Sequence, residues 1–482
     1  MDFSMADGFS AETETEVPDA GSAEAPSADE ILDLMLTVLS DGLNHPEIWA
    51  AVPEVLDALP HLPTTIEGRL TYAGGAERVG LLLLLGMCGA ALGEAKSMLE
   101  QLEPLSAEHS QSPLVQGALF HFQRLIHPDD PKYQLEGKIC PTPFVQTDVL
   151  DGTTHLCCAS WLKTSVGDMG SNEWQDVWNS ETAQAIRESI HDGSYRYCNK
   201  SACPKIQAGH LTPAAELREQ SDFWRDIIDS VRTEVARGPE VVNLAYDRTC
   251  NLSCPSCRVE RIAADEATRN RYERMQERTI LPLLKGAKLV FVTGSGDPFA
   301  SKNFRRLLQQ LTPEEFPELK FQIMTNGMLF TPRQWGDFPS IHRRVAMLKI
   351  SVDAATGPTH ELLRRGARWP TMLENMAFAG SLLEAGEIDN FELVFTVQKE
   401  NFREMGAAID LAKQVGARQI WFGRITNWGT FSDAEYRDKA VFLASHPDHQ
   451  EFLAAMADPR LRDPMVIKGD LEEFIPKVAQ AA

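Results

Sequence analysis

The stretch VVNLAYDRTCNLSCPSC at residues 241–257 joins a short apolar run to three closely spaced cysteines. The run at 241–246 is typical of a buried β-strand. Cys250, Cys254 and Cys257 follow it with three and then two residues between them. Three thiolates from one tight loop can bind three irons of a 4Fe-4S cluster and leave the fourth iron open. Zinc is the alternative metal, although it prefers four protein ligands, usually in Cys-x2-Cys pairs.

The chain after this stretch alternates between strand-like and helix-like segments. Further strands are expected at 288–294, 319–327, 345–353, 391–398 and 417–425. Six buried strands with helical connections predict a parallel α/β fold, either an open sheet or a partial barrel. In such folds the reactive groups lie at the carboxyl ends of the strands, which is where the cysteine loop stands.

The cysteine loop resembles the signature loop of the radical S-adenosylmethionine enzymes. The segment Gly294-Ser295-Gly296-Asp297, at the end of the second strand, is similar to that family's glycine-rich motif. Such a backbone approaches a ligand closely and its carbonyls accept hydrogen bonds from an ammonium group. The resemblance covers about residues 236–430 and implies a partial (β/α)6 TIM-like barrel. It departs from the family at Ser256, where an aromatic residue near adenine is common, and at Asp297, where glutamate is usual.

Later strand ends carry hydroxyl, carboxylate and amide side chains that could bind the ribose or the methionine part of S-adenosylmethionine. A guanidinium suits the methionine carboxylate, but Arg365 and Arg368 stand beside Arg364, which leaves the choice open. Turn or capping roles are the alternative for several of these side chains. The residues that the resemblance assigns to the cofactor here are Thr325, Asn326, Ser351, Asp353, Arg364, Gln398 and Asn401.

A second group of cysteines lies before the strands, within residues 131–215. Its spacing resembles a short form of the auxiliary-cluster domain called SPASM, and the resemblance implies a second 4Fe-4S cluster. The implied ligands are Cys140, Cys157, Cys198 and Cys203. The position after Asp151-Gly152 favours Cys157 over Cys158, and four thiolates saturate a cluster of four irons. A closed zinc site is the alternative. This domain usually follows the barrel, whereas here it precedes it.

The remaining parts of the chain give weaker signals. Residues 1–27 are acidic and rich in Ala and Ser, which predicts a disordered tail. The pattern of residues 28–130 predicts a helical domain. Residues 431–482 are expected to form an extension that closes the barrel or contacts substrate. The apolar run at 79–92 falls short of the ~20 residues that cross a bilayer, which predicts a buried helix.

The charge balance limits the partners that we expect. Acidic residues outnumber basic ones by 69 to 46, for a net charge of -23, and such a field repels nucleic acid and anionic membranes. The N-terminus lacks the pattern of a signal peptide, which indicates a cytoplasmic location. In that reducing compartment nine cysteines indicate metal or redox chemistry rather than disulfides.

The resemblance implies an oxidoreductase that splits S-adenosylmethionine reductively into methionine and a 5'-deoxyadenosyl radical, which abstracts a hydrogen from substrate. The auxiliary cluster would take up an electron from the substrate radical, or it would bind the substrate radical or tune its reactivity. The electron donor would be a flavodoxin or ferredoxin. Family members with this auxiliary domain commonly modify peptides, so maturation of a peptide or protein is the first expectation. The alternatives are a radical dehydrogenase or epimerase of a sugar or other small molecule, and a non-catalytic, zinc-stabilised binding protein. No acid or base that quenches the product is identified.

Overall fold

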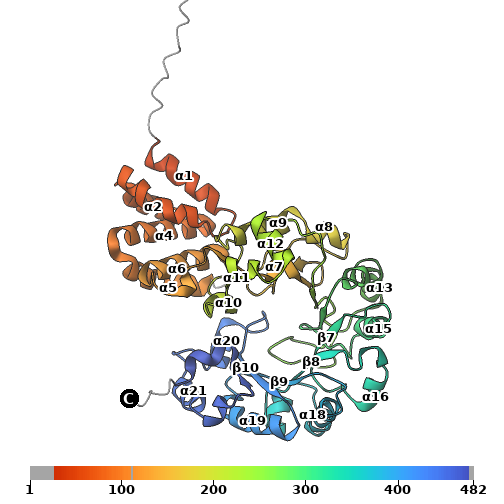
Figure 1. Ribbon diagram of the computed structural model, residues 1–482. Helices are drawn as coiled ribbons and strands as arrows, with labels where there is room; N and C mark the ends of the chain where they lie inside the picture. The colour runs from red at the N-terminus through yellow and green to blue at the C-terminus, as the bar shows by residue number, and fades with distance from the viewer. Residues whose placement is uncertain (1–25, 110–111, 477–482) are drawn as a thin grey trace, which may run out of the picture.

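The computed structural model describes residues 26–109 and 112–476. The expected tail at 1–27 therefore lies almost entirely outside the described residues, as do the last six residues of the C-terminal extension. In Figure 1 the N-terminal helices stand to one side of a curved body, which holds all of the strands.

The first helices share a hydrophobic core of their own. Ser27 begins the first of them with a capping box, since its hydroxyl accepts from the backbone of Glu30 while the Glu30 carboxylate accepts from Ser27. The elements are α1 (Ala28–Leu39), α2 (Pro46–Ala58), α3 (Leu62–Leu70), α4 (Gly75–Gly89), a π turn η1 (Ala90–Glu94), α5 (Ala95–Glu108) and α6 (Pro113–Ile126).

The stretch Gly75–Leu105 is long and apolar enough, by length and composition alone, to cross a membrane. It is not one straight helix, because Gly93 takes a φ of 91° and breaks it. The arms α4 and α5 then pack against each other so closely that a Cβ on Gly86 would lie 2.8 Å from Leu102. Cys88 and its leucine neighbours are buried in the helical core. Most of the run at 79–92 is thus a buried helix, as expected, but its end turns to the surface, where Leu92 is 68% exposed.

The curved body is built on a nine-stranded sheet in the order β11-β10-β9-β8-β7-β6-β5-β2-β3. Six consecutive parallel strands match the six segments expected from the sequence, and each begins and ends within its predicted range. Their bounds are β5 (Val241–Leu244), β6 (Leu289–Val292), β7 (Lys320–Thr325), β8 (Val345–Ser351), β9 (Phe391–Val397) and β10 (Gln419–Arg424).

Helices connect these strands and lie on the outer side of the curve (Figure 1). The side of the sheet that they cover is apolar, which places the main hydrophobic core between the two layers. The connecting elements are α13 (Glu266–Met275), η3 (Gln276–Ile280), α14 (Leu281–Leu284), α15 (Lys302–Gln310), α16 (Pro332–Gly336), η4 (Pro339–Ile341), α17 (Gly357–Leu363), α18 (Trp369–Glu384), η5 (Phe402–Glu404) and α19 (Met405–Gln414).

Both edges of the sheet are extended by other parts of the chain. From the C-terminal residues, β11 (Val466–Ile467) pairs in parallel with β10. At the opposite edge β2 (Gln146–Val149), from the cysteine-rich region, pairs in parallel with β5, and β3 (Thr154–His155) pairs antiparallel with β2. The cysteine-rich region therefore continues the sheet of the strand region, a connection that sequence reasoning did not foresee.

Short elements fill the cysteine-rich region and the C-terminal part. The first set is η2 (Pro131–Tyr133), β1 (Lys138–Ile139), α7 (Thr142–Val145), α8 (Trp174–Trp178), α9 (Glu181–His191), α10 (Pro204–Gln207), β4 (Thr212–Pro213), α11 (Ala214–Arg218) and α12 (Asp222–Asp229). The second set is α20 (Asp433–Lys439), α21 (His449–Met456), η6 (Pro459–Arg462) and η7 (Gly469–Phe474).

Arg187 on α9 holds the cysteine-rich region together. Its side chain is fully buried and donates to the carbonyls of Pro143, Trp178 and Thr233 at 2.9, 2.9 and 2.8 Å, and to Oδ1 of Asn179 at 3.0 Å. Burial lowers the pKa of Arg187 to about 9. One guanidinium thus satisfies four oxygens from three separate segments.

Replacing Arg187 by Met should strip those buried oxygens of their donor and lower the free energy of unfolding by about 3 kcal/mol or more. The measurement is urea unfolding followed by tryptophan fluorescence. Arg218→Met is the matched control, because Arg218 pairs with Asp229 at the surface and its loss should leave the midpoint nearly unchanged. Equal midpoints for the two variants would show that Arg187 is no anchor.

Candidate functional site

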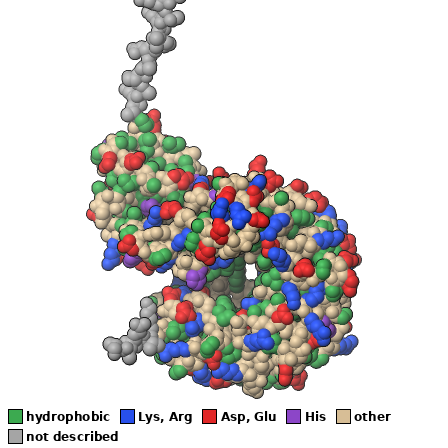
Figure 2. Space-filling view, viewed as in Figure 1, with side chains coloured by type: hydrophobic (Ala, Val, Ile, Leu, Met, Phe, Trp, Pro, Cys, Tyr) green, Lys and Arg blue, Asp and Glu red, His purple; other side chains and the backbone are tan. Residues whose placement is uncertain are grey.

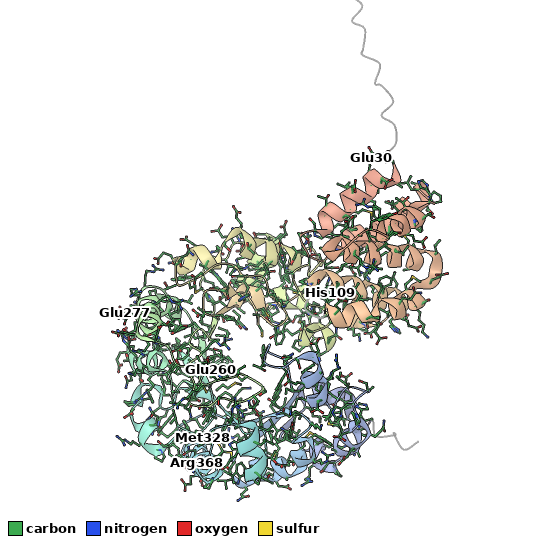
Figure 3. The ribbon with its side chains drawn as sticks, turned by 180° about the vertical axis from the view of Figure 1, so that it is seen from behind. Glu30, His109, Glu260, Glu277, Met328 and Arg368 are labelled. Carbon is green, nitrogen blue, oxygen red and sulfur yellow. The ribbon has the colours of Figure 1, made fainter. Side chains whose placement is uncertain are left out.

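The cysteine loop follows β5 and lies on the inner side of the curved body. Cys250 and Cys254 are buried and pack with Ala367, and Cys257 lies against them. Burial raises the pKa of Cys250 and of Cys254, and in each case a neighbouring sulfur raises it further. Three thiols are therefore gathered in one place, and burial disfavours the thiolate forms of Cys250 and Cys254, which a bound cluster would stabilise. Figure 3 shows Glu260, just after the loop, facing inward, whereas Glu277 lies on the outer rim.

The glycine motif after β6 is packed directly onto this loop. A Cβ on Gly296 would lie 2.7 Å from the carbonyl oxygen of Thr249, so no side chain fits there. The backbone N–H of Asp297 donates to that same oxygen at 2.9 Å. Gly294, by contrast, faces open space, with nothing within 4 Å of where its Cβ would be. The motif therefore touches the cysteine loop on one side and is open to a ligand on the other.

Asp297 joins the ends of two strands. Its carboxylate is fully buried and accepts from Oγ1 of Thr325 at 2.7 Å and from the N–H groups of Asn326 and Phe299 at 2.9 and 3.0 Å. Burial raises its pKa, which these hydrogen bonds oppose. Asn326 in turn donates to Oδ1 of Asn251 at 2.9 Å, within the cysteine loop. Asp297, Thr325 and Asn326 thus brace the site with side chains that are already paired.

Asp353 and Arg364 form an ion pair of 2.7 Å beside the loop. Burial lowers the pKa of Arg364, but the charges of Asp353 and Cys254 outweigh burial and raise it. Nε of Arg364 is buried without a hydrogen-bond partner among the described residues. Arg365 is exposed and donates to backbone oxygens, whereas Arg364 lies against the sulfur of Cys254.

The residues expected after β8 and β9 separate into two kinds. Asn401 donates to the carbonyls of Asp353 and Thr396 at 2.9 and 2.8 Å, which makes it a brace between strand ends. Ser351 is buried at the end of β8. Gln398 lines a cavity of about 70 Å³ together with Ser256 and Phe431. The C-terminal part of the chain therefore does reach the cysteine loop, and it brings an aromatic ring close to Ser256.

Arg258 is a site residue that sequence reasoning missed. It is buried and donates to the carbonyls of Arg248 at 2.8 Å and Ser295 at 2.7 Å, and to Sγ of Cys257 at 3.2 Å. It therefore fastens the glycine motif to the cysteine loop. The available signal was an arginine directly after the last cysteine, a position where a cation lies beside a thiolate.

The second cysteine group also comes together in space. Burial raises the pKa of Cys198 well above its usual value, and the sulfurs of Cys203, Cys140 and Cys157 raise it further. The raised pKa of Cys158 has burial as its cause, with Asp148 and no other sulfur adding to it. The four thiols that lie together are thus the four expected, with Cys157 rather than Cys158 as the second.

The donor sets suit clusters better than a single ion. Among residues 26–109 and 112–476, no group of three or more His, Cys, Asp or Glu side chains is close enough to hold one metal ion. A zinc ion needs four sulfurs at about 2.3 Å from one point. A cluster of four irons is larger and takes its thiolates at wider separations.

Comparison with known proteins agrees with this donor set. Residues 140–204 match the family model of SPASM, an iron-sulfur cluster-binding domain. The chain therefore contains a SPASM-type domain, a type of domain that binds iron-sulfur clusters.

The curated relatives of this chain are distant in sequence. An uncharacterized protein of Archaeoglobus fulgidus is 24% identical over 202 residues, which are 40% of this chain and 45% of that protein. The AdoMet-dependent heme synthase of Methanosarcina barkeri is 24% identical over 186 residues, or 38% of this chain and 50% of that protein. The chain spans about half the length of the curated relatives that it matches.

Among solved structures, the chain is similar to Streptococcus suis SuiB bound to precursor peptide SuiA. The TM-score is 0.31 at 15% identity, over 55% of this chain and 57% of that one. A structure of anSMEcpe with bound AdoMet and a peptide gives a TM-score of 0.29 at 19% identity, over 39% of this chain and 52% of that one.

Trp161 contacts the auxiliary cysteines directly. Its indole Nε1 donates to Sγ of Cys157 at 3.1 Å. The ring of Trp174, by contrast, lies against the backbone at Gly238. Hydrogen bonds to ligand sulfurs are among the features that set the potential of an iron-sulfur cluster, so Trp161 would tune a cluster held by Cys157.

The adjacent cysteines offer a matched pair of variants. Cys157→Ala should remove one of four auxiliary ligands and lower the iron content of anaerobically purified protein by about four per chain. Cys158→Ala should keep the full content, because its sulfur does not lie with the other four. Iron and sulfide analysis checks this, and the reverse result would exchange the two assignments.

Replacing Trp161 by Phe should lower the reduction potential of the auxiliary cluster, because the N–H donor that stabilises the more negative, reduced state is lost. Redox titration followed by electron paramagnetic resonance measures the shift. Trp174→Phe removes an indole from the same region without touching a sulfur and should leave the potential unchanged. An unchanged reduction potential in Trp161→Phe would mean that the hydrogen bond from Trp161 to Cys157 is absent in the protein with its cluster bound.

Proposed function

We propose that this chain is a radical S-adenosylmethionine oxidoreductase that abstracts a hydrogen atom from a peptide or protein and completes an oxidation or cross-link. One observation carries the proposal. The loop of Cys250, Cys254 and Cys257 is clamped by Arg258 to a glycine motif whose other side is open. When loaded and reduced, the 4Fe-4S cluster supplies the electron that splits S-adenosylmethionine into methionine and a 5'-deoxyadenosyl radical.

The six parallel strands support a partial (β/α)6 barrel with S-adenosylmethionine at its carboxyl edge. The open face of Gly294 leaves room for the backbone to accept from the amino group. The unpaired Nε of Arg364 is suited to the methionine carboxylate. Ser351 and Gln398 complete the polar contacts. Phe431 supplies the aromatic ring beside adenine that Ser256 lacks.

The side chains of the other predicted cofactor residues are proposed to hold the backbone of the site in place rather than to contact the cofactor. Their side chains are already paired with protein groups, so they fix the strand ends to which the ligand binds. These positioning residues are Asp297, Thr325, Asn326, Asp353 and Asn401. Ser295 belongs with them, since its hydroxyl donates to the carbonyl of Ala245 at 2.5 Å.

The auxiliary 4Fe-4S cluster, on Cys140, Cys157, Cys198 and Cys203, is proposed to take the electron that the substrate radical loses. In this scheme the substrate first loses one hydrogen atom to the deoxyadenosyl radical. It then loses one electron and one proton, so that the net change is a two-electron oxidation. A flavodoxin or ferredoxin is the proposed electron donor. The lack of nucleic-acid or membrane partners stays a prediction from charge, and a cytoplasmic location stays a prediction from the pattern of the first residues.

A peptide substrate is supported by the SPASM-type domain and by the shape of the molecule. Figure 2 shows an opening that leads into the middle of the protein between the cysteine-rich region and the C-terminal part. A second candidate, radical oxidation of a small molecule, is favoured by one observation, which is that a curated relative is named an AdoMet-dependent heme synthase.

The core of the proposal is tested by replacing Cys250, Cys254 and Cys257 together by Ala. The wild-type protein should hold about eight irons and the variant about four, since only the auxiliary cluster would remain. With S-adenosylmethionine and dithionite, 5'-deoxyadenosine should form in the wild type and fall to background in the variant. Retained deoxyadenosine formation by the variant would refute the assignment.

The substrate class is tested by isotope transfer. A deuterated precursor peptide encoded beside the gene should pass one deuterium into 5'-deoxyadenosine, read by mass spectrometry. Deuterium that comes only from a labelled porphyrin precursor would replace the peptide by the small-molecule candidate. Neither outcome depends on the cluster variants above.

A further inference from the structure

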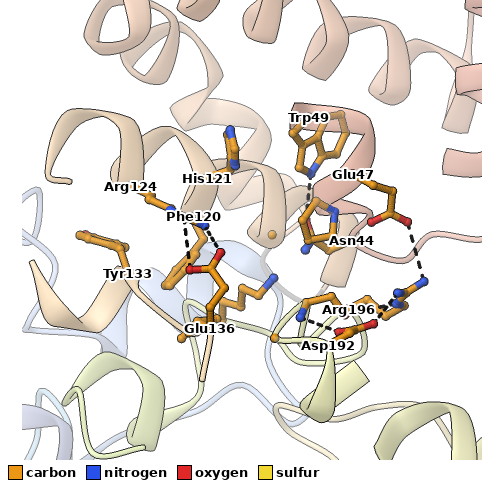
Figure 4. A pocket seen from close by; sticks show the side chains of 16 residues that line it. Asn44, Glu47, Trp49, Phe120, His121, Arg124, Tyr133, Glu136, Asp192 and Arg196 are labelled. Carbon is orange, nitrogen blue, oxygen red and sulfur yellow. Dashed lines mark hydrogen bonds and ion pairs between the residues drawn. The ribbon is translucent and has the colours of Figure 1, made fainter. Parts of the chain in front are cut away.

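A cavity of about 410 Å³ lies where the N-terminal helices meet the cysteine-rich region (Figure 4). Its wall holds three cations and three carboxylates, and ion pairs from its two arginines reach all three carboxylates. The cations are Arg124, Arg196 and Lys200, and the carboxylates are Glu47, Glu136 and Asp192. The charges of this cavity therefore balance within the described residues, and it offers a ligand no charge in excess.

The smaller cavity of about 70 Å³ beside the cysteine loop differs, because one carboxylate oxygen there lacks a partner. Glu400, in the loop after β9, lines this cavity together with Ser256, Gln398 and Phe431. Its Oε1 accepts from Nζ of Lys439, the last residue of α20. Its Oε2 is buried and has no hydrogen-bond partner among the described residues. Such an oxygen is costly to bury, which indicates that a donor from a ligand belongs there.

The end of α20 holds Glu400 in its place. Beside the ion pair of Lys439 with Glu400, the backbone N–H of Lys399 donates to the carbonyl of Lys439 at 3.0 Å. Nζ of Lys399 pairs with Asp438 at 2.5 Å. Because these contacts join α20 to both residues, the carboxylate of Glu400 is oriented before any ligand enters.

The side chains around Glu400 complement one edge of adenine. Adenine carries an amino group, which donates, next to ring nitrogens, which accept. A carboxylate oxygen accepts from such an amino group, and the amide of Gln398 offers both a donor and an acceptor. A glutamine amide is a known partner of the amino group and a ring nitrogen of adenine. Phe431 supplies a flat apolar face for the ring.

We propose that Glu400 determines the base specificity of the site, because its Oε2 accepts a hydrogen bond from the amino group of adenine. This inference rests on the proposed function, which puts S-adenosylmethionine at the cysteine loop with its base beside Phe431. Hypoxanthine has a carbonyl oxygen in place of the amino group. That oxygen would face the carboxylate as a second acceptor and leave Oε2 unpaired, so the site selects an amino purine.

The test is isothermal titration calorimetry on anaerobically reconstituted protein with S-adenosylhomocysteine and S-inosylhomocysteine. The wild type should bind the adenosyl compound at least about tenfold more tightly. Glu400→Gln should erase this preference, because its amide donates to the carbonyl of hypoxanthine as readily as it accepts from adenine. Asp438→Asn is the matched control, since Asp438 pairs with Lys399 and lies outside the cavity wall, and it should keep the preference.

A second variant guards against a loss of folding in the first. Glu400→Asp keeps a negative charge near Lys439 but withdraws the oxygen from the cavity, so it should also lose the preference while retaining full iron content. Equal binding of the two compounds by the wild type overturns the inference and leaves the proposed function standing. An undiminished preference in either Glu400 variant does the same. Binding of neither compound by the reconstituted wild type would overturn the proposed S-adenosylmethionine site itself.

Discussion

The close contact between Gly296 and the cysteine loop is the constraint on which the site depends. With no Cβ at that position, the end of β6 can lie directly against the carbonyl of Thr249. Arg258 then holds both segments from the other side. Any side chain at 296 would push the glycine motif away from the cysteines. The backbone of the glycine motif therefore lies in direct contact with the backbone of the cysteine loop. This contact fixes the distance between the two segments and leaves little freedom for either segment to move.

Hydrogen bonds of buried polar side chains also fix the ends of the neighbouring strands. The carboxylate of Asp297 receives donors from the end of β7, and Asn401 ties the end of β9 to that of β8. Each side chain is fully buried, and each is satisfied by several hydrogen bonds. Such networks specify one arrangement, because breaking any bond leaves an unpaired group away from water. The four strand ends thus form a single surface around the loop.

Much of the fold could be predicted from local sequence patterns. Contacts between residues that are distant in the sequence could not be predicted from such patterns. The six strands are apolar runs bounded by turns, and each was predicted correctly. In contrast β2 is four residues long and three of them are polar, with Asp148 buried against Asn243, so its sequence does not resemble a core strand. The choice of Cys157 over Cys158 as a cluster ligand came from register alone and stays a prediction. The contact of Trp161 needed the fold, because a hydrogen bond to sulfur leaves no trace in spacing, whereas Arg258 had one local signal, its place directly after Cys257.

The pairing of β2 with β5 makes the two halves of this protein one folding unit. If the chain were cut before residue 236, β5 would become an edge strand with a row of unsatisfied N–H and C=O groups. Such an edge invites pairing with other chains and aggregation. The strand region therefore depends on residues that are synthesised before it. A fragment that begins at residue 236 lacks the strand β2 that covers the edge of β5.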